Sequence, residues 1–205
     1  MIIHDCEQGT PEWHSLRAGK PTASVFSKLI TSTGANSKQL EEYAIDLAIE
    51  LLNGEAIQDF SGNKHTRRGH EVEPEACADY EMENQVHVDH VGFITDNLGR
   101  YGCSPDGLIG NDGGLEIKCK SDKEHYKMLK KYDVDGMTPA SHIAQPQGCM
   151  FITKRKWWDL YLYHPKMRCV TIRQYPDLLY FKTLRKQLKT IETRRNLILE
   201  DMRRT

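Results

Sequence analysis

The segment from residue 104 to 119 limits the possible folds of this chain more than any other. It reads Ser-Pro-Asp-Gly, then a turn-forming Asn111-Asp112-Gly113-Gly114, then Leu-Glu-Ile-Lys-Cys. The segments on either side, 100–103 and 115–119, predict two strands joined by a hairpin. Because side chains alternate along a strand, Glu116 and Lys118 should share one face while Ile117 turns to the core. Two neighbouring strands can then bring Asp106 close to Glu116.

Two carboxylates and an ammonium placed in this way suit metal-assisted phosphodiester hydrolysis. Hard carboxylate oxygens favour Mg²⁺, which activates water and polarises a phosphate. A lysine beside them can orient the attacking water or stabilise charge in the transition state. The bare pattern is short, however, and a surface ion pair on a hairpin produces it as well. The residues alone leave both interpretations open.

Periodicity elsewhere predicts an α+β fold with a mixed central β-sheet flanked by α-helices. Helices are expected at about 11–17, from Thr22 as a cap, at 40–51, 69–83, 121–132 and 139–151 (interrupted by Pro146), and at the end of the chain. Strands are expected at 86–94, 100–103, 115–119, 157–163 and 169–175.

No repeat or low-complexity linker divides the 205 residues, which predicts one domain over 1–205. The start of the sequence has no basic, apolar leader, and no run reaches the roughly 18 apolar residues of a membrane helix. A cytoplasmic protein is expected.

The cysteines and histidines predict no structural metal centre. Six cysteines are scattered without a Cys-x-x-Cys pair, so we expect reduced thiols. His87 and His90 have no cysteine or second histidine pair near them in the sequence, and we expect them to be solvated or packed.

The net charge of −1 hides two opposite segments. Residues 41–116 carry 17 acidic and 4 basic side chains, whereas residues 154–205 carry 14 basic and 5 acidic ones. This division fits a protein that holds cations in one region and phosphates in another, and equally fits two solvated faces of opposite charge.

Four motifs in order resemble the lambda exonuclease family of viral-type recombinase nucleases, which has a restriction-endonuclease-like core. They are Trp13-His14-Ser15-Leu16-Arg17-x-Gly19-x-x-Thr22-Ala23-Ser24, Gly69-x-x-x-Glu73-x-x-Ala76, the pair Cys103-Ser104-Pro105-Asp106-Gly107-Leu108 and Leu115-Glu116-Ile117-Lys118-Cys119, and Ala144-Gln145-x-Gln147-x-x-Met150. Together they extend from about residue 12 to 152.

The resemblance implies a role for each matching residue. Asp106 and Glu116 would ligate the metal, helped by Glu73 and the Ile117 carbonyl. Lys118 would be the catalytic lysine, and Gln145 would position water or a ligand. Arg17 with Ser24 would hold a DNA 5′-phosphate. For a basic residue near the scissile phosphate, both Lys120 and Lys123 are in range.

The resemblance also implies a 5′→3′ exodeoxyribonuclease that acts on double-stranded DNA ends and leaves 3′ overhangs for recombination by single-strand annealing. The implied cofactor is Mg²⁺, with Mn²⁺ as a substitute. The implied assembly is a homotrimer working with a single-strand annealing protein. The alternatives are a structure-specific or restriction-type endonuclease with the same core, and an inactive DNA-binding module.

Overall fold

The computed structural model describes residues 1–57 and 64–204 of the chain. Its helices are α1 (Pro11–Arg17), α2 (Leu40–Asn53), α3 (Lys64–Asn84), α4 (Asp122–Asp135), α5 (Ala144–Thr153) and α6 (Leu178–Met202), with the 3-10 helices η1 (Ala23–Lys28) and η2 (Ala140–His142). Its strands are β1 (Ile2–His4), β2 (Val88–Asp89), β3 (Phe93–Thr95), β4 (Gly102–Cys103), β5 (Gly107–Ile109), β6 (Gly113–Cys119), β7 (Trp157–Tyr163) and β8 (Val170–Gln174).

The strands form two sheets. The larger has five strands in the order β2-β5-β6-β7-β8, and the smaller has three in the order β1-β3-β4. Only the β6–β7 pair of the larger sheet is parallel, so this sheet is mixed, as the sequence predicts. A parallel pair needs a crossover connection, and α4, η2 and α5 provide it.

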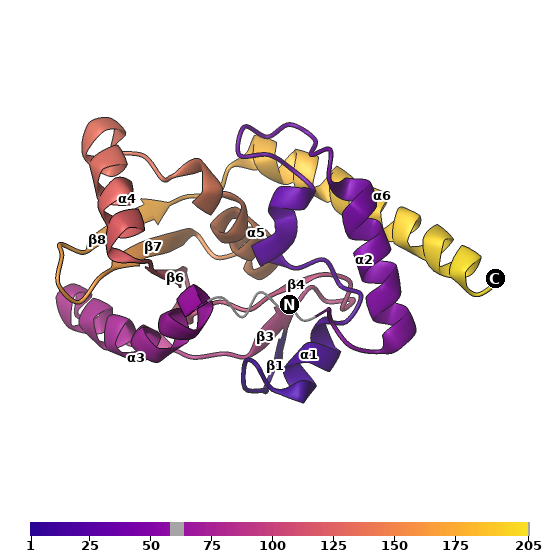
Figure 1. Cartoon of the computed structure of the whole chain (residues 1–205), viewed down its shortest axis with the longest axis horizontal. Helices are drawn as coiled ribbons and strands as arrows, with labels where there is room; N and C mark the ends of the chain where they lie inside the picture. Colours follow the sequence, from indigo (N-terminus) through magenta and orange to yellow (C-terminus); the bar gives the residue numbers. More distant parts are fainter. Residues whose placement is uncertain (58–63, 205) are drawn as a thin grey trace.

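Helices cover both faces of the larger sheet, with α3 on one side and α4 on the other (Figure 1). On the α3 side, Ala76 and Tyr80 pack with Leu115 and Tyr161. On the α4 side, Met128 and Tyr132 pack against the alternate residues of β7 and β8. The α+β architecture expected from the sequence is therefore confirmed.

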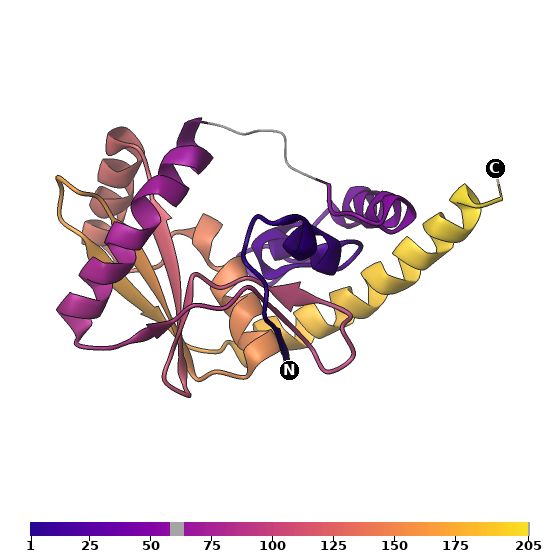
Figure 2. The same ribbon diagram turned by 90° about the horizontal axis from the view of Figure 1, so that it is seen from below.

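Helix α6 lies along α2 and extends past it at the C-terminal end (Figures 1 and 2). The helix expected at the end of the chain is confirmed, and its Leu184, Leu188 and Ile191 are buried in the main core. Helix α2 ends at Gly54, whose φ of 78° is the left-handed conformation that suits glycine. Within the described residues, no helix is both long and apolar enough to cross a membrane.

Several expected boundaries differ from those observed. Thr22 precedes a 3-10 helix and makes no side-chain capping bond. Pro146 does not interrupt α5, because it is the third residue of the helix, where its missing N–H has no partner within the helix to lose. The predicted hairpin between 100–103 and 115–119 is wrong, because β4 pairs with β3 in the smaller sheet. The strand that pairs with β6 is β5, which the sequence did not predict, and Gly113 and Gly114 belong to β6 instead of a turn.

Candidate active site

The β5–β6 hairpin places Asp106 opposite the middle of β6. Gly107 pairs with Leu115, so Asp106, immediately before β5, reaches the next residues of the partner strand. The backbone N–H of Ile117 donates a 2.5 Å hydrogen bond to Oδ2 of Asp106. This bond fixes the carboxylate against the strand that carries Glu116.

Two glycines at the start of β6 let that strand approach β7. A Cβ on Gly113 would lie 2.1 Å from the ring of Trp157, and a Cβ on Gly114 would lie 2.3 Å from the ring of Trp158. Both separations are far below van der Waals contact. The glycines thus belong to the sheet because the tryptophan rings of β7 occupy the space of their missing side chains.

Glu116 is the centre of a hydrogen-bonded group. It is only 1% exposed, and its Oε1 accepts a hydrogen bond from Lys118 Nζ. Its Oε2 accepts a 2.6 Å bond from Nε2 of Gln145, at the start of α5. The alternation predicted for β6 is observed: Ile117 is buried on the opposite face, among the residues that pack against α3.

The electrostatics of the site favour the arrival of a cation. Burial raises the pKa of Asp106 to about 6, and the charge of Glu73 adds to this. Burial raises the pKa of Glu116 to about 7, and Asp106 is its next cause. Burial alone would lower the pKa of Lys118, but the carboxylates, led by Glu116, outweigh it and raise it. The positive charge of Lys118 therefore does not fully offset the burial of the two carboxylates, and a bound cation would stabilise their charged forms.

Glu73 approaches this group from α3. Burial and then the charge of Glu116 raise its pKa. Glu73 and Asp106 line a pocket of about 350 Å³ together with Cys77, Glu81 and other residues of α3 and β6. The same two carboxylates line a second pocket, of about 500 Å³, whose other wall is the N-terminal segment 3–8.

Arg17 lies at the end of α1, against the segment that leads to Asp106. Its guanidinium lies 4.1 Å from the centre of the Trp13 ring, and its Nη1 is 3.4 Å from the hydroxyl of Ser104. Trp13 Nε1 donates to the same hydroxyl at 2.8 Å. Ser24 is exposed in η1, and its hydroxyl is 3.3 Å from that of Thr22. No contact joins Arg17 directly to Ser24.

The two lysines after β6 differ in position. Lys120 is half-buried, and burial, then the charge of Lys118, lowers its pKa. Lys123 is exposed in the first turn of α4. Lys120 therefore lies close enough to feel the charges of Lys118 and Glu116 in the candidate site.

Sequence reasoning did not single out Gln8 or Ser104. Gln8 Nε2 donates to the carbonyls of Val91 (3.1 Å) and Pro105 (3.0 Å), which holds the loop before Asp106. Ser104 lies within a quoted motif, and its position two residues before Asp106 was the available signal. Nothing near Gln8 in the sequence points to its partners.

The donor set suits a hard divalent ion. Asp106, Glu116 and Glu73 offer carboxylate oxygens, and the Ile117 carbonyl belongs to the same strand. In the part of the chain that the structure describes, no three histidine, cysteine, aspartate or glutamate side chains stand close enough to enclose an ion as they are.

The sequence of the chain matches a known protein family. The model of the YqaJ-like viral recombinase domain matches residues 12–156, more than half of the chain. The chain belongs to this family. The family is that of lambda exonuclease, so the resemblance noted in the sequence is confirmed.

Solved structures agree with the YqaJ-like assignment. The alkaline exonuclease LHK-Exo of Laribacter hongkongensis is 28% identical, with a TM-score of 0.83 over 95% of this chain and 97% of that one. Its complex with dAMP has a TM-score of 0.82, with the same identity and coverage. A phage-related exonuclease from Haemophilus somnus, 15% identical with a TM-score of 0.70 over 89% and 96% of the two chains, supports the fold alone. No curated protein matches the chain. The fold of the YqaJ-like chain is thus restriction-endonuclease-like.

Proposed function

We propose that this YqaJ-like chain is a Mg²⁺-dependent exodeoxyribonuclease that degrades double-stranded DNA from its ends in the 5′→3′ direction and leaves 3′ single-stranded overhangs. The observation that carries the proposal is the cluster of Asp106, Glu116, Lys118 and Gln145, joined by side-chain and backbone hydrogen bonds. Similarity to an alkaline exonuclease over nearly the whole chain supports the reaction class.

Each residue of the cluster has a distinct part. Asp106 and Glu116, with Glu73 and the Ile117 carbonyl, would hold Mg²⁺, and Mn²⁺ would be able to replace it. When bound, the ion supplies Lewis-acid activation of water and phosphate. Lys118 donates to the attacking water or to the charge that develops on the phosphate. Gln145 orients Glu116 through its amide and would also position water or a ligand. Lys120 is the better candidate of the two lysines for the scissile phosphate.

The N-terminal elements supply end recognition in this proposal. Arg17 carries a planar guanidinium that can form two parallel bonds to a phosphate. Its stacking on Trp13 and its contact with Ser104 place it beside the loop of Asp106. With Ser24, it would hold the 5′-phosphate while the terminal bond lies at the carboxylates.

Membership of the family supports a proposal about the assembly and the partner of the chain. We propose that the 205 residues form one nuclease domain that assembles as a homotrimer around DNA and works in the cytoplasm with a single-strand annealing protein. Within this assembly the basic segment 154–205 would line the DNA path.

The experiment compares linear duplex DNA with covalently closed circular DNA of the same sequence, with Mg²⁺ and with EDTA. We expect cleavage of the linear substrate only, and only with Mg²⁺. Asp106→Ala and Glu116→Ala should abolish cleavage while DNA binding persists, and Lys118→Ala should lose about 10²–10³ in rate. Cleavage of the closed circle would instead identify an endonuclease, and full activity of the three variants would refute the site.

A further inference from the structure

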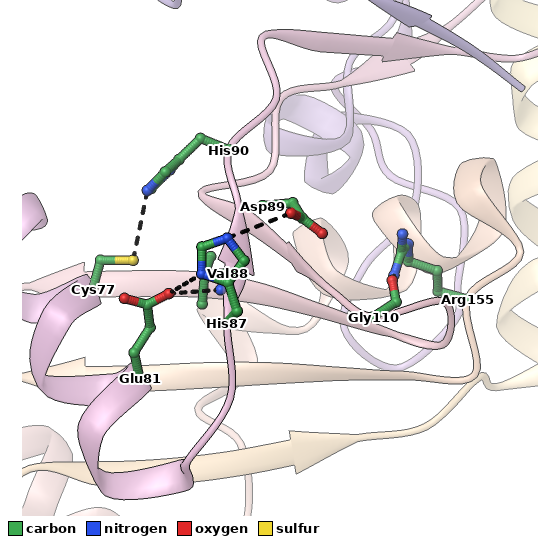
Figure 3. A network of polar contacts seen from close by, with 8 residues as sticks. All are labelled: Cys77, Glu81, His87, Val88, Asp89, His90, Gly110 and Arg155. Atoms are coloured by element: carbon green, nitrogen blue, oxygen red, sulfur yellow. Dashed lines mark hydrogen bonds and ion pairs between the residues drawn. The ribbon is translucent and has the colours of Figure 1, made fainter.

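Cys77 and His90 meet on the wall of the 350 Å³ pocket that Glu73 and Asp106 also line. Cys77 Sγ lies 3.8 Å from His90 Nε2. Cys77 projects from α3, and His90 follows β2 and points back toward that helix (Figure 3). The thiol is 5% exposed, while the imidazole is exposed.

The separation of these two atoms matches that of two ligands of one tetrahedral ion. With Zn–S of about 2.3 Å and Zn–N of about 2.0–2.1 Å, a tetrahedral angle puts sulfur and nitrogen about 3.6 Å apart. The observed 3.8 Å differs from this by less than an ordinary side-chain adjustment. A thiolate and an imidazole are also the ligands that select Zn²⁺ over Mg²⁺.

A carboxylate of the same helix face can complete the set. Glu73, Cys77 and Glu81 are spaced four residues apart on α3, and all three line the 350 Å³ pocket with His90. Glu81 uses Oε1 for its bonds from the Val88 N–H (2.7 Å) and from His87 Nδ1 (3.0 Å) (Figure 3). The three side chains do not enclose an ion as they stand, so the proposal requires the Glu81 side chain to rotate and bring Oε2 to the thiol and the imidazole.

We propose that Cys77, His90 and Glu81 bind one Zn²⁺ ion, with water as the fourth ligand, and that this ion inhibits the nuclease. Binding removes the thiol proton of Cys77, which passes to solvent, and forms a Zn–S bond.

Inhibition follows from the shared pocket, and it rests on the proposed function. Glu73 lies one helical turn before Cys77 and lines the same pocket as Asp106. A second dication there attracts the Glu73 carboxylate away from the catalytic group and repels Mg²⁺. Zinc should therefore act at concentrations far below those of Mg²⁺ in the reaction.

The binding test uses Co²⁺ as a spectroscopic substitute for Zn²⁺, with full-length protein and without DNA. A cysteine ligand gives a thiolate-to-cobalt charge-transfer absorption that carboxylate ligands do not give. We expect this absorption in the wild type, its disappearance on addition of Zn²⁺, its loss in Cys77→Ser, and at least tenfold weaker binding in His90→Gln. Cys169→Ser and His87→Gln are the matched controls and should keep it. Circular dichroism confirms that each variant is folded.

Two results would overturn the site: no charge-transfer absorption in the folded wild type at saturating Co²⁺, or an unchanged absorption in Cys77→Ser. Neither result depends on nuclease activity, so a failure of the metal site can be distinguished from a failure of the proposed function. In the second arm, Zn²⁺ is titrated into the Mg²⁺-supported reaction. The concentration for half-inhibition should rise at least tenfold in Cys77→Ser relative to Cys169→Ser, and equal values would refute the inhibitory role.

Discussion

Nε2 of Gln145 lies 2.6 Å from Oε2 of Glu116 and joins the first turn of α5 to the middle of β6. Glu116 is nearly inaccessible to solvent, so water cannot easily replace the hydrogen bond that this amide donates. Gln145→Ala should lower the cleavage rate about 10–100-fold, because the carboxylate loses an orienting partner. Gln145→Glu should lower the rate further, since it places a second carboxylate against that of Glu116.

Gln147, two residues later, is the matched control. Its amide bonds the Tyr175 carbonyl (2.8 Å) and the Asp177 N–H (2.9 Å), away from the catalytic group. Gln147→Ala should therefore lower the urea midpoint and leave the rate per folded molecule unchanged. The opposite pattern, with Gln147→Ala losing rate and Gln145→Ala only stability, would contradict the assignment.

Arg17 predicts a preference for phosphorylated ends. Rates of the wild type and of Arg17→Ala should be compared on duplexes bearing a 5′-phosphate or a 5′-hydroxyl. The wild type should digest the phosphorylated end faster, and the advantage should shrink in the variant, because the guanidinium no longer binds the phosphate. An equal preference in both proteins would give Arg17 another role.

Loss of the buried Asp159 carboxylate should lower the stability of the fold. Its side chain is 0% exposed, and it accepts hydrogen bonds from Tyr80 (2.6 Å) and from Arg173 (2.8 and 2.9 Å). Asp159→Ala should cost about 1–3 kcal/mol, since it leaves the buried Tyr80 hydroxyl without its acceptor and the partly exposed Arg173 without its partner. Tyr80→Phe should cost about 1 kcal/mol.

Asp112 provides the comparison for that measurement. It pairs with Lys156 on the surface, where both side chains are more than half exposed, so Asp112→Ala should change stability by less than about 1 kcal/mol in urea unfolding. A similar loss of stability in both variants would show that the destabilisation by Asp159→Ala does not come from the burial of its carboxylate.

His142 predicts a loss of stability in mild acid. Burial, with the charges of Lys118 and Lys120, lowers its pKa from 6.5 to about 4. Between these values the unfolded chain binds the proton and the folded one does not, so stability falls as pH falls through this window. Its contribution to the loss between pH 7.5 and 5 should be on the order of 2 kcal/mol. Urea titrations of His142→Gln should show a smaller loss, and an identical slope would remove His142 as the cause.

Local patterns predicted much of this fold and site. Alternation along β6 placed Glu116, Ile117 and Lys118 on their correct faces, since a strand fixes this whatever surrounds it. The 3.6-residue periodicity similarly identified α2 and α6.

The missed features depend on distant partners. Strand β1 has three residues and exists because Ile2 pairs with Thr95, which nothing local indicates. The glycines of β6 resemble a turn until Trp157 and Trp158 are seen to cover them. No cysteine lies beside His90 in the sequence, because Cys77, which it contacts, is on the preceding helix, 13 residues away. Contacts between elements cannot be read from either element alone.

The parallel pairing of β6 with β7 has a consequence for folding. Asp106, Glu116 and Lys118 come together through one short hairpin, whereas Gln145 reaches Glu116 only after the chain has crossed over through α4 and η2. Contacts of short sequence separation form with little loss of chain entropy, and longer closures form later. The carboxylates should therefore assemble before the amide that orients them arrives. In rising urea, a partly opened molecule that has released α5 would still hold its acidic residues together, and we expect cleavage to be lost before the sheet unfolds.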